Sequence, residues 1–377
     1  MNNAKIRVLL IAVLLTGSIT GSLAQKEAGY ASIHRIMSRM PDSLTYSTQD
    51  IADYVDSKFS TQREKSRAIF LWIARNIAYN FDSLFSNRYD ETASEISERI
   101  LKTRIGVCLN YATLFNEISN KAGIKSYVVQ GYTKQSGRVH YLPHVWCAGF
   151  IDSAWYLTDP TWGAGYVYKG KFINQINSSY LMAKPEVMIR SRMPFDPVWQ
   201  LLYHPITHQE FYKSNFRTGK NRLYFSFPDS LRAYEQSTEL DRAISSARRI
   251  EQYGVMNSFI EAKLRVLQGD IVYFRNRISA EKYESAVNKY NAGINMLNRF
   301  IGYRNNRFQP ERDSAQYEQL LDSTEYLFNM AIQTLAGING PDENIINSAV
   351  SLNDAIGVTL IALHEQRFSL KSYLKDR

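Results

Sequence analysis

The sequence predicts an α+β fold that is followed by an all-α helical bundle. Between residues 61 and 122, apolar side chains recur at the three- and four-residue spacing of amphipathic helices. Between residues 125 and 159, short segments rich in β-branched and aromatic residues replace that pattern, as is typical of antiparallel strands. From residue 229 onward, long helical patterns contain little proline or glycine. A mixed core therefore precedes a helical region.

The elements of the core are expected in the following order. Residues 26–60 form a helical lead-in with a loop, and residues 61–78 form a strong amphipathic helix. A short helix at 91–102 leads into a second helix at 108–122, which Gly123 ends. Strands are then expected at 125–132, 144–151 and 155–159.

The remaining chain is expected to wrap the strands and then to form a bundle. Residues 160–227 are rich in proline, glycine and aromatic residues and have little regular period, so they are expected to cover the strand region. No repeat of fixed period favours a solenoid over a bundle. The expected helices of the bundle are 229–252, 254–277, 279–303, 310–336 and 341–375.

The first residues have the pattern of an export signal. Lys5 and Arg7 precede the apolar run 8–15, and Ser22-Leu23-Ala24 is a small-x-small cleavage site before Gln25. The apolar run is short for an uncleaved membrane anchor, which is the alternative. The expected division is a signal peptide at 1–24, a core domain with N-terminal helices at 25–228 and a helical domain at 229–377, in a periplasmic or secreted protein.

Composition narrows the classes of partner. The 377 residues carry a formal net charge of +9, but the basic residues are dispersed and no nucleic-acid-binding motif occurs. No nucleic acid partner is therefore expected, and no stretch after the export signal is expected to span a membrane stably. No phosphate-binding loop and no zinc-ligand spacing occur, so no cofactor and no metal are expected.

One cysteine has the setting of a nucleophile. Cys108 follows Gly106 closely and begins a predicted helix, whose positive end favours a thiolate. A thiol nucleophile needs a base, and the base needs an orienting group. His144 starts one strand and Asp159 ends the next, so a hairpin brings them close. Either they lie directly opposite, or His144 faces Thr161 and Asp159 is its diagonal neighbour on the same face.

The other cysteine and histidines allow competing interpretations. Cys147 lies three residues after His144, so a regular strand directs it to the opposite face as a core residue. A disulfide between Cys108 and Cys147 is the alternative that would abolish nucleophilic chemistry. His204 and His208 are expected at the surface. Trp146 and Trp162 are candidates for the walls of a substrate cleft.

Three ordered motifs resemble a known family. GVCLNYATLF, HVWCAGF and WYLTDPTWGAG look like the transglutaminase-like superfamily, with its Cys at a helix start, its His-x-Trp strand and its Asp-Pro-Thr-Trp ending. The resemblance covers roughly 65–200, and SRMPFDPVWQLL resembles a segment that follows the core in a bacterial exported, kyphoscoliosis-peptidase-like subgroup. The helical region lies outside it.

The resemblance implies a fold and a reaction. It implies a papain-like core in which Cys108 is the nucleophile, His144 the base and acid, and Asp159 the group that orients the imidazole. A thioester would form at a peptide or protein amide, with cell-wall peptides among the candidate substrates, and water or an amine would resolve it. The Cys108 backbone N–H is one candidate oxyanion donor. Hydrolysis is favoured over cross-linking because no amine-donor site is visible.

A non-enzymatic function is the alternative. The same fold could present a peptide groove without catalysis, and the C-terminal helices could bind a protein partner. The large helical region without a chemical motif is the observation behind this alternative, and an unreactive Cys108 would favour it.

Overall fold

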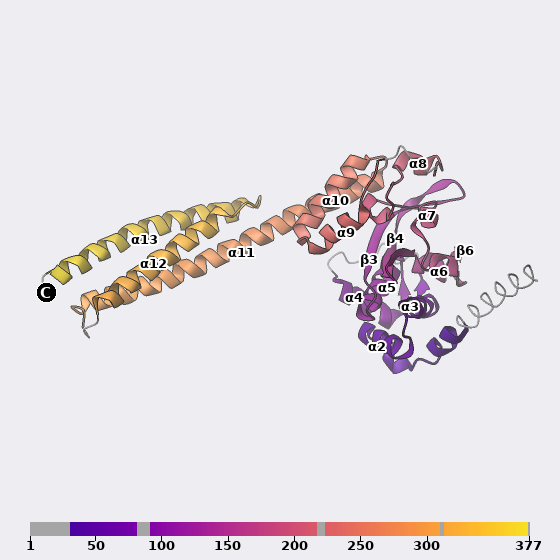
Figure 1. Cartoon of the computed structure of the whole chain (residues 1–377), viewed down its shortest axis with the longest axis horizontal. Helices are drawn as coiled ribbons and strands as arrows, with labels where there is room; N and C mark the ends of the chain where they lie inside the picture. The colour runs from indigo at the N-terminus through magenta and orange to yellow at the C-terminus, as the bar shows by residue number, and fades with distance from the viewer. Residues whose placement is uncertain (1–30, 81–90, 217–222, 310–312, 376–377) are drawn as a thin grey trace, which may run out of the picture. The chain divides into compact units, whose positions relative to one another are not determined.

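A computed structural model gives the fold and the side-chain contacts of most of the chain (Figure 1). The residues that the structure describes are 31–80, 91–216, 223–309 and 313–375. The expected signal peptide at 1–24 lies outside these residues.

The chain divides into two compact units. The first unit, called here the sheet unit, contains the described residues up to Glu235 together with Arg249–Glu261. The second, called here the helical unit, contains Gln236–Arg248 and the described residues from Ala262 onward.

The helices of the sheet unit begin at well-formed caps. The side chains of Thr61 and Thr92 each accept the backbone N–H three residues later, and Glu64 and Glu95 reciprocate as capping boxes. Each such cap is worth about 1 kcal/mol. The helices are η1 Asp42–Leu44, α2 Thr48–Lys58, α3 Gln62–Asn76, α4 Ala93–Thr103 and α5 Cys108–Lys121. The last three fit the expected helices at 61–78, 91–102 and 108–122.

A four-stranded antiparallel sheet forms the centre of the sheet unit, in the order β5-β4-β3-β8. Asp152 and Ser153 form the two-residue turn between β4 and β5 with φ of 48° and 63°, so Ile151 pairs with Ala154. This register follows the second alternative, in which residue 144 aligns with residue 161. The strands are β3 Ser126–Gln135, β4 Arg138–Ile151, β5 Ala154–Thr158 and β8 Arg192–Pro194.

The hairpin of β3 and β4 is longer than the sequence predicts. β4 begins at Arg138 rather than at residue 144, and Ser136 and Gly137 form its turn with positive φ. The polar, proline-containing start of β4 has no strand pattern of its own, and it forms a strand because it pairs with β3. The expected strand at 125–132 is correspondingly extended to Gln135.

The segment 160–227 contains more regular structure than expected. It includes a small sheet in which β6 Gly165–Tyr168 pairs with β7 Lys171–Asn174. A second small sheet lies earlier in the chain, where β1 Ala78–Tyr79 pairs with β2 Ile105–Gly106. The short helices of the segment 160–227 are α6 Pro160–Ala164, η3 Ser178–Tyr180, α7 Pro185–Met188, η4 Pro197–Gln200 and α8 His208–Tyr212.

An apolar core lies on each face of the main sheet. Neighbouring residues of β4 show the alternation: Cys147 belongs to the core shared with α3 and α5, whereas Trp146 belongs to the core shared with η4 and the next helix. Phe227 and Leu231 of that next helix complete the second core. The first helix beyond the expected boundary at 228/229 therefore packs in the sheet unit.

The C-terminal region consists of helices, as predicted, but their boundaries differ. The predicted helix 229–252 is two helices, and the predicted helices 254–277 and 279–303 are one continuous helix of 48 residues. No proline or glycine interrupts the chain near residue 278, so nothing there ends the helix. The helices are α9 Phe227–Gln236, α10 Glu239–Tyr253, α11 Ser258–Asn305, α12 Ser314–Ala336 and α13 Glu343–Lys375.

The core of the helical unit has the spacing of a coiled coil. The buried residues of α12 alternate at intervals of four and three, and four buried residues of α13 recur every seventh position. Those of α12 are Tyr317, Leu321, Thr324, Phe328, Ala331 and Leu335, and those of α13 are Ala349, Ile356, Leu363 and Leu370.

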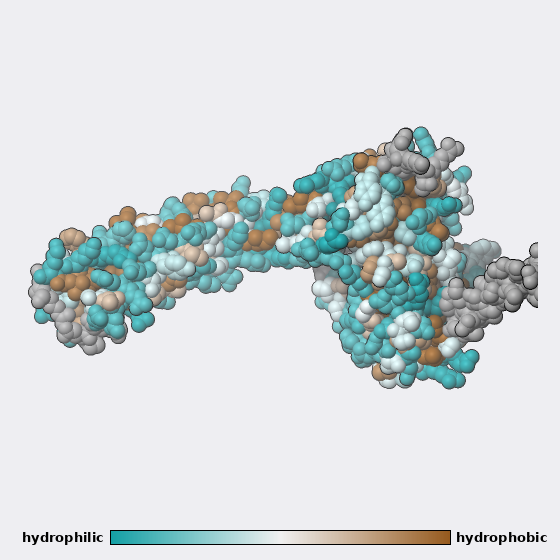
Figure 2. All heavy atoms as spheres, in the orientation of Figure 1, coloured by the Kyte–Doolittle hydropathy of each residue, from teal (hydrophilic) through white to brown (hydrophobic). Residues whose placement is uncertain are grey.

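The outer face of α13 carries exposed apolar residues. Val350, Val358, Ile361 and Phe368 are all more than half exposed, and Figure 2 shows apolar residues (brown) among hydrophilic ones (teal) on this unit. One 18-residue window of α13 has a mean hydropathy of 1.5 and is 11% buried, so its length and composition would allow it to cross a membrane. The expectation that no later stretch is apolar enough to span does not hold for this helix.

Candidate active site

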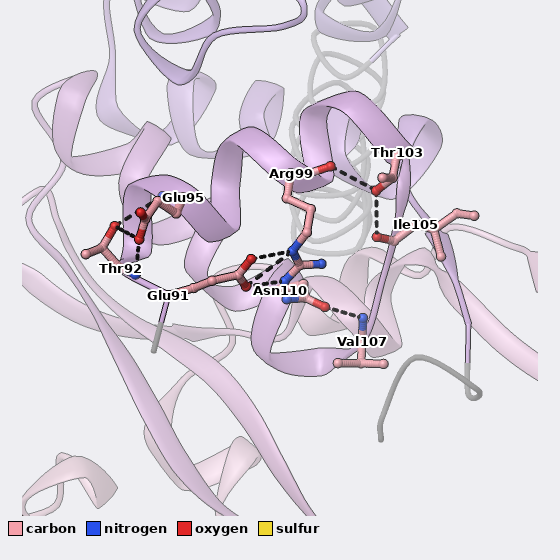
Figure 3. A network of polar contacts seen from close by, with 8 residues as sticks. All are labelled: Glu91, Thr92, Glu95, Arg99, Thr103, Ile105, Val107 and Asn110. Atoms are coloured by element: carbon pink, nitrogen blue, oxygen red, sulfur yellow. Dashed lines mark hydrogen bonds and ion pairs between the residues drawn. The ribbon is translucent and has the colours of Figure 1, made fainter. Parts of the chain in front are cut away.

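The thiol of Cys108 lies at the first position of α5. Asn110 accepts a hydrogen bond from the Val107 backbone N–H at 2.9 Å and so caps the helix (Figure 3). Gly106 makes room for this cap, because a Cβ there would lie 2.9 Å from the Cβ of Asn110. The absence of a side chain at Gly106 therefore accommodates the Asn110 side chain.

The segment before Cys108 is held by a strand pairing: β2 pairs in parallel with β1, with Tyr79 opposite Gly106. At the end of α4, the Thr103 hydroxyl lies 3.4 Å from the Ile105 carbonyl oxygen (Figure 3). Arg99 of α4 forms a bidentate ion pair with Glu91, with a shortest distance of 2.8 Å (Figure 3). The pairing of β2 with β1 fixes the approach to α5 and hence the position of the thiol.

His144 and Asp159 meet as a buried pair. The Nε2 atom of His144 lies 2.7 Å from Oδ2 of Asp159, and the two residues are 7% and 0% exposed. Because a carboxylate only accepts hydrogen bonds, Nε2 carries the proton and Nδ1 is left for another partner. Cys108 is the neighbour on the cavity side: it lines the same cavity as His144 and contributes to the raised pKa of the imidazole.

Asp159 is also the cap of the next helix. Its Oδ1 atom accepts the backbone N–H of Thr161 at 3.1 Å and that of Trp162 at 3.0 Å, at the start of α6. The Asp-Pro sequence therefore ends β5, begins α6 and holds the carboxylate in one orientation. Oδ2 is left free to face His144.

Arg192 is a fourth member of this cluster, and the sequence analysis missed it. Its side chain is 1% exposed, and its Nε donates to Oδ2 of Asp159 at 2.7 Å. Its guanidinium carbon lies 4.3 Å from the ring centre of Trp162 and 4.7 Å from that of Tyr180. The guanidinium is thus held between two aromatic rings while it faces the same oxygen as His144.

These neighbours change the pKa values of the pair. Burial disfavours the charged imidazolium, but Asp159 and the Cys108 thiol outweigh it and raise the pKa of His144 to about 9. Burial also disfavours the Asp159 carboxylate, but His144 and Arg192 hold its pKa well below the usual range. An imidazolium and a carboxylate therefore coexist at neutral pH.

A cavity of about 810 Å³ opens onto the thiol and the imidazole. Cys108, His144 and Trp162 all line it, together with aromatic side chains from four other elements. Trp146 is completely buried in the second core, and its ring centre lies 6.2 Å from that of His144. Of the two candidate cleft tryptophans, the structure thus brings only Trp162 to the cavity.

The remaining candidates lie elsewhere. Cys108 and Cys147 are both free thiols, and the Cys147 thiol donates to the Ala112 carbonyl of α5 at 3.2 Å. His208 is 1% exposed rather than at the surface; its Nδ1 lies 2.9 Å from the Tyr132 hydroxyl, and burial lowers its pKa to about 4. Among the described residues, no group of three His, Cys, Asp or Glu side chains could hold a metal ion.

A sequence signal for Arg192 was present but weak. Arg192 lies in SRMPFDPVWQLL, which the sequence analysis associated with the family but to which it gave no role. An arginine among the many apolar residues of this segment is a signal, because arginine is almost never fully buried unless it is paired. That burial arises from β8, in which Arg192 pairs with Thr133 of β3.

Comparison with known proteins finds relatives of the core. A model of the transglutaminase-like superfamily matches residues 49–160. Kyphoscoliosis peptidase of Mus musculus is 32% identical over 165 residues, which cover 42% of this chain and 24% of that protein. The Homo sapiens protein of the same name is 33% identical over 159 residues, with 40% and 24% covered. The chain thus spans about a quarter of the length of these curated relatives.

A solved structure is also similar over part of the chain. The periplasmic domain of TgpA from Pseudomonas aeruginosa is 21% identical, covers 30% of this chain and 42% of that one, and has a TM-score of 0.26. The range matched by the family model, residues 49–160, spans Cys108, His144 and Asp159. Residues 49–160 of the chain are thus similar to the transglutaminase-like superfamily.

Proposed function

We propose that the protein is an exported cysteine-type hydrolase or acyltransferase that acts on peptide or protein amides, and that it hydrolyses them rather than cross-linking them. The family match supports this reaction class. The observation that carries the proposal is the convergence of Cys108 and His144 on one cavity, with His144 bonded to Asp159. Export depends on the pattern of residues 1–24.

The first half of the proposed reaction forms a thioester. The imidazolium of His144 stabilises the thiolate of Cys108, whose sulfur attacks the carbonyl carbon of the amide. The carbonyl electron pair moves to oxygen, and the Cys108 backbone N–H is one donor available to that oxyanion. His144 then gives its proton to the leaving nitrogen, the C–N bond breaks, and an amine departs.

The second half restores the enzyme. Neutral His144 takes a proton from water as the water oxygen attacks the thioester carbon. The C–S bond then breaks, which releases a carboxylic acid and returns the thiolate beside the imidazolium. Asp159 keeps Nε2 protonated throughout, so that Nδ1 faces the reacting atoms.

The alkylation rate of Cys108 tests this proposal directly. The full chain is treated with iodoacetamide from pH 5 to 10, and mass spectrometry of the labelled peptides separates Cys108 from Cys147. We expect rapid labelling of Cys108 well below the free-thiol pKa of about 8.5. In His144→Ala we expect labelling to be slow there and to rise only near that value.

The alternative is a peptide-binding or partner-binding module on the same fold. In that case Cys108 would react slowly at neutral pH in the wild-type protein, and His144→Ala would change little. That result would exclude the enzymatic proposal. Cys108→Ala is the control for turnover of any peptide substrate and should fold like the wild type.

A further inference from the structure

The hairpin of β6 and β7 forms one wall of the cavity that contains Cys108. Three consecutive residues of β6, Gly165, Tyr166 and Val167, line this cavity. Successive side chains of a strand point to opposite faces. Three in a row therefore place the backbone of β6 at the cavity, and Phe172 of β7, the pairing partner of Val167, lines it as well.

The register of the hairpin shows which backbone groups lie on the outer edge of β6. Lys169 and Gly170 form a two-residue turn with φ of 48° and 75°, so Tyr168 and Lys171 are the closing hydrogen-bonded pair. Val167 is the next residue along, and hydrogen-bonded and non-hydrogen-bonded pairs alternate. The N–H and C=O of Val167 therefore point away from β7, toward the outer edge.

The base of the β6–β7 hairpin is fixed to α6. The Gln175 N–H donates to the Ala164 carbonyl at 3.0 Å, and the Asn177 N–H donates to the Gly163 carbonyl at 2.9 Å. Both acceptors belong to α6, the helix that Asp159 caps. The edge of β6 is thus held in a defined position relative to the catalytic candidates.

Large side chains surround this edge on the cavity side. Tyr166 and Val167 are 51% and 45% exposed, which leaves them available for contact with a ligand. Trp162 and Tyr180 line the same cavity. Apolar and aromatic walls beside an outward-facing strand backbone match the requirements of an extended peptide.

We propose that the substrate is an extended peptide segment that binds as an additional antiparallel strand on β6, with one of its residues exchanging both backbone hydrogen bonds with Val167. This inference depends on the proposed function, since the bound peptide must present its amide to Cys108. It names the substrate class as unfolded or loop segments of polypeptide rather than helices or compact surfaces.

The probes are acetyl-Ala-Ala-Phe chloromethyl ketone and three N-methylated derivatives of it. The thiolate of Cys108 displaces chloride from the methylene carbon, so a C–S bond forms, the C–Cl bond breaks and chloride leaves. The second-order rate with each probe is divided by the rate with iodoacetamide, which is too small to pair with a strand. This ratio isolates recognition by the peptide backbone from the reactivity of the thiol.

The test in the protein is Val167→Pro, with Val167→Ala as the matched control. Proline at position 167 removes the backbone N–H that points away from β7. An edge strand tolerates proline at a position whose N–H makes no hydrogen bond to the neighbouring strand. We expect Val167→Pro to lower the rate ratio roughly tenfold, the effect of about one net hydrogen bond, and Val167→Ala to lower it much less. Equal ratios in the two variants would overturn the proposal.

A second test changes the probe instead of the protein, so it does not depend on the folding of any variant. Three further probes carry a single N-methyl group on each amide nitrogen in turn. In the wild-type protein we expect one of them, and not all three, to lose roughly tenfold in rate ratio, because one peptide N–H donates to the Val167 carbonyl. Equal ratios for all four probes would overturn the proposal even if iodoacetamide reacts rapidly. Slow iodoacetamide labelling of wild-type Cys108 would instead overturn the proposed function on which it depends.

Discussion

At the scale of single residues, the most informative feature is the oxygen of Asp159 that two cations share. Oδ2 faces Nε2 of His144 and Nε of Arg192, both at 2.7 Å. A carboxylate between two buried cations stays ionised and cannot rotate away from either. We infer that Arg192 acts as a positioning residue, because it acts on the imidazole through Asp159.

Replacing Arg192 separates this role from a purely structural one. Arg192→Met leaves Asp159 buried with a single cation, so the pKa of Asp159 should rise and the stability should fall by about 3–5 kcal/mol. In the wild-type protein we expect Cys108 alkylation to stay rapid at acidic pH, and in Arg192→Met we expect this rapid alkylation at acidic pH to be lost. Arg192→Lys should restore part of the rate at acidic pH, since it keeps the charge. An unchanged pH profile in Arg192→Met would contradict the positioning role. Ser191→Ala is the control, because it removes the 2.8 Å bond from Arg192 to Ser191 and leaves the pairing of Arg192 with Asp159 in place.

The raised pKa of His144 predicts how stability depends on pH. Its pKa is about 9 in the folded chain against 6.5 for an ordinary histidine, so folding favours the imidazolium. That contribution is complete below pH 6.5 and is lost as the pH rises through 9. His144→Gln should therefore cost more free energy of unfolding at pH 6 than at pH 10, as urea unfolding can measure. An equal cost at both values would show that His144 is not charged in the folded protein.

At the scale of elements, the position of β8 decides whether Arg192 reaches the site. β8 pairs with β3 through Gly131, which lies between His144 on one side and Pro194 on the other. A Cβ on Gly131 would meet the Met193 carbonyl oxygen at 2.2 Å. Glycine at this position therefore permits β8 to approach the sheet.

Gly131→Ala tests this dependence. The added methyl group would push β8 from β3, so we expect a loss of about 1–3 kcal/mol of stability and slower alkylation of Cys108 at acidic pH. Gly149→Ala is the matched control on β4, where the nearest atom to an added Cβ is 3.8 Å away. Wild-type behaviour of Gly131→Ala would mean that the sheet adapts without moving Arg192.

The same elements explain what the sequence could and could not predict. The helix start at Cys108 and the hairpin joining His144 to Asp159 are local patterns, and residue spacing alone indicated both. β8 has only three residues and pairs Arg192 with Thr133, so its existence depends on contacts between distant parts of the chain. The start of β4 was missed for the same reason, since its polar sequence acquires strand structure only by pairing with β3.

At the scale of the whole molecule, the two units have separate apolar cores. Phe328 of α12 is completely buried in the helical unit, in a core formed by α11, α12 and α13. Phe328→Ala should therefore destabilise that unit by about 3–5 kcal/mol. We expect the alkylation rate of Cys108 to stay unchanged under native conditions while urea unfolding, followed by circular dichroism, shows an earlier helical transition.

Val358→Ala is the control for this prediction. Val358 is 69% exposed, so its truncation should change stability by no more than about 0.5 kcal/mol. If Phe328→Ala slowed alkylation of Cys108 while Val358→Ala did not, the helical unit would have to support the active site, and the units could not be treated as independent.

The contrast between the two thiols supplies an internal standard for counting active molecules. Cys147 is fully buried, and burial raises the pKa of its thiol, so it labels only when the sheet unit unfolds. Cys108 borders the cavity, so we expect it to label in the folded state. In a single preparation, the label on Cys147 therefore measures the misfolded fraction, and the label on Cys108 beyond that amount measures functional sites. Rates from different variants can then be expressed per competent molecule without a known substrate.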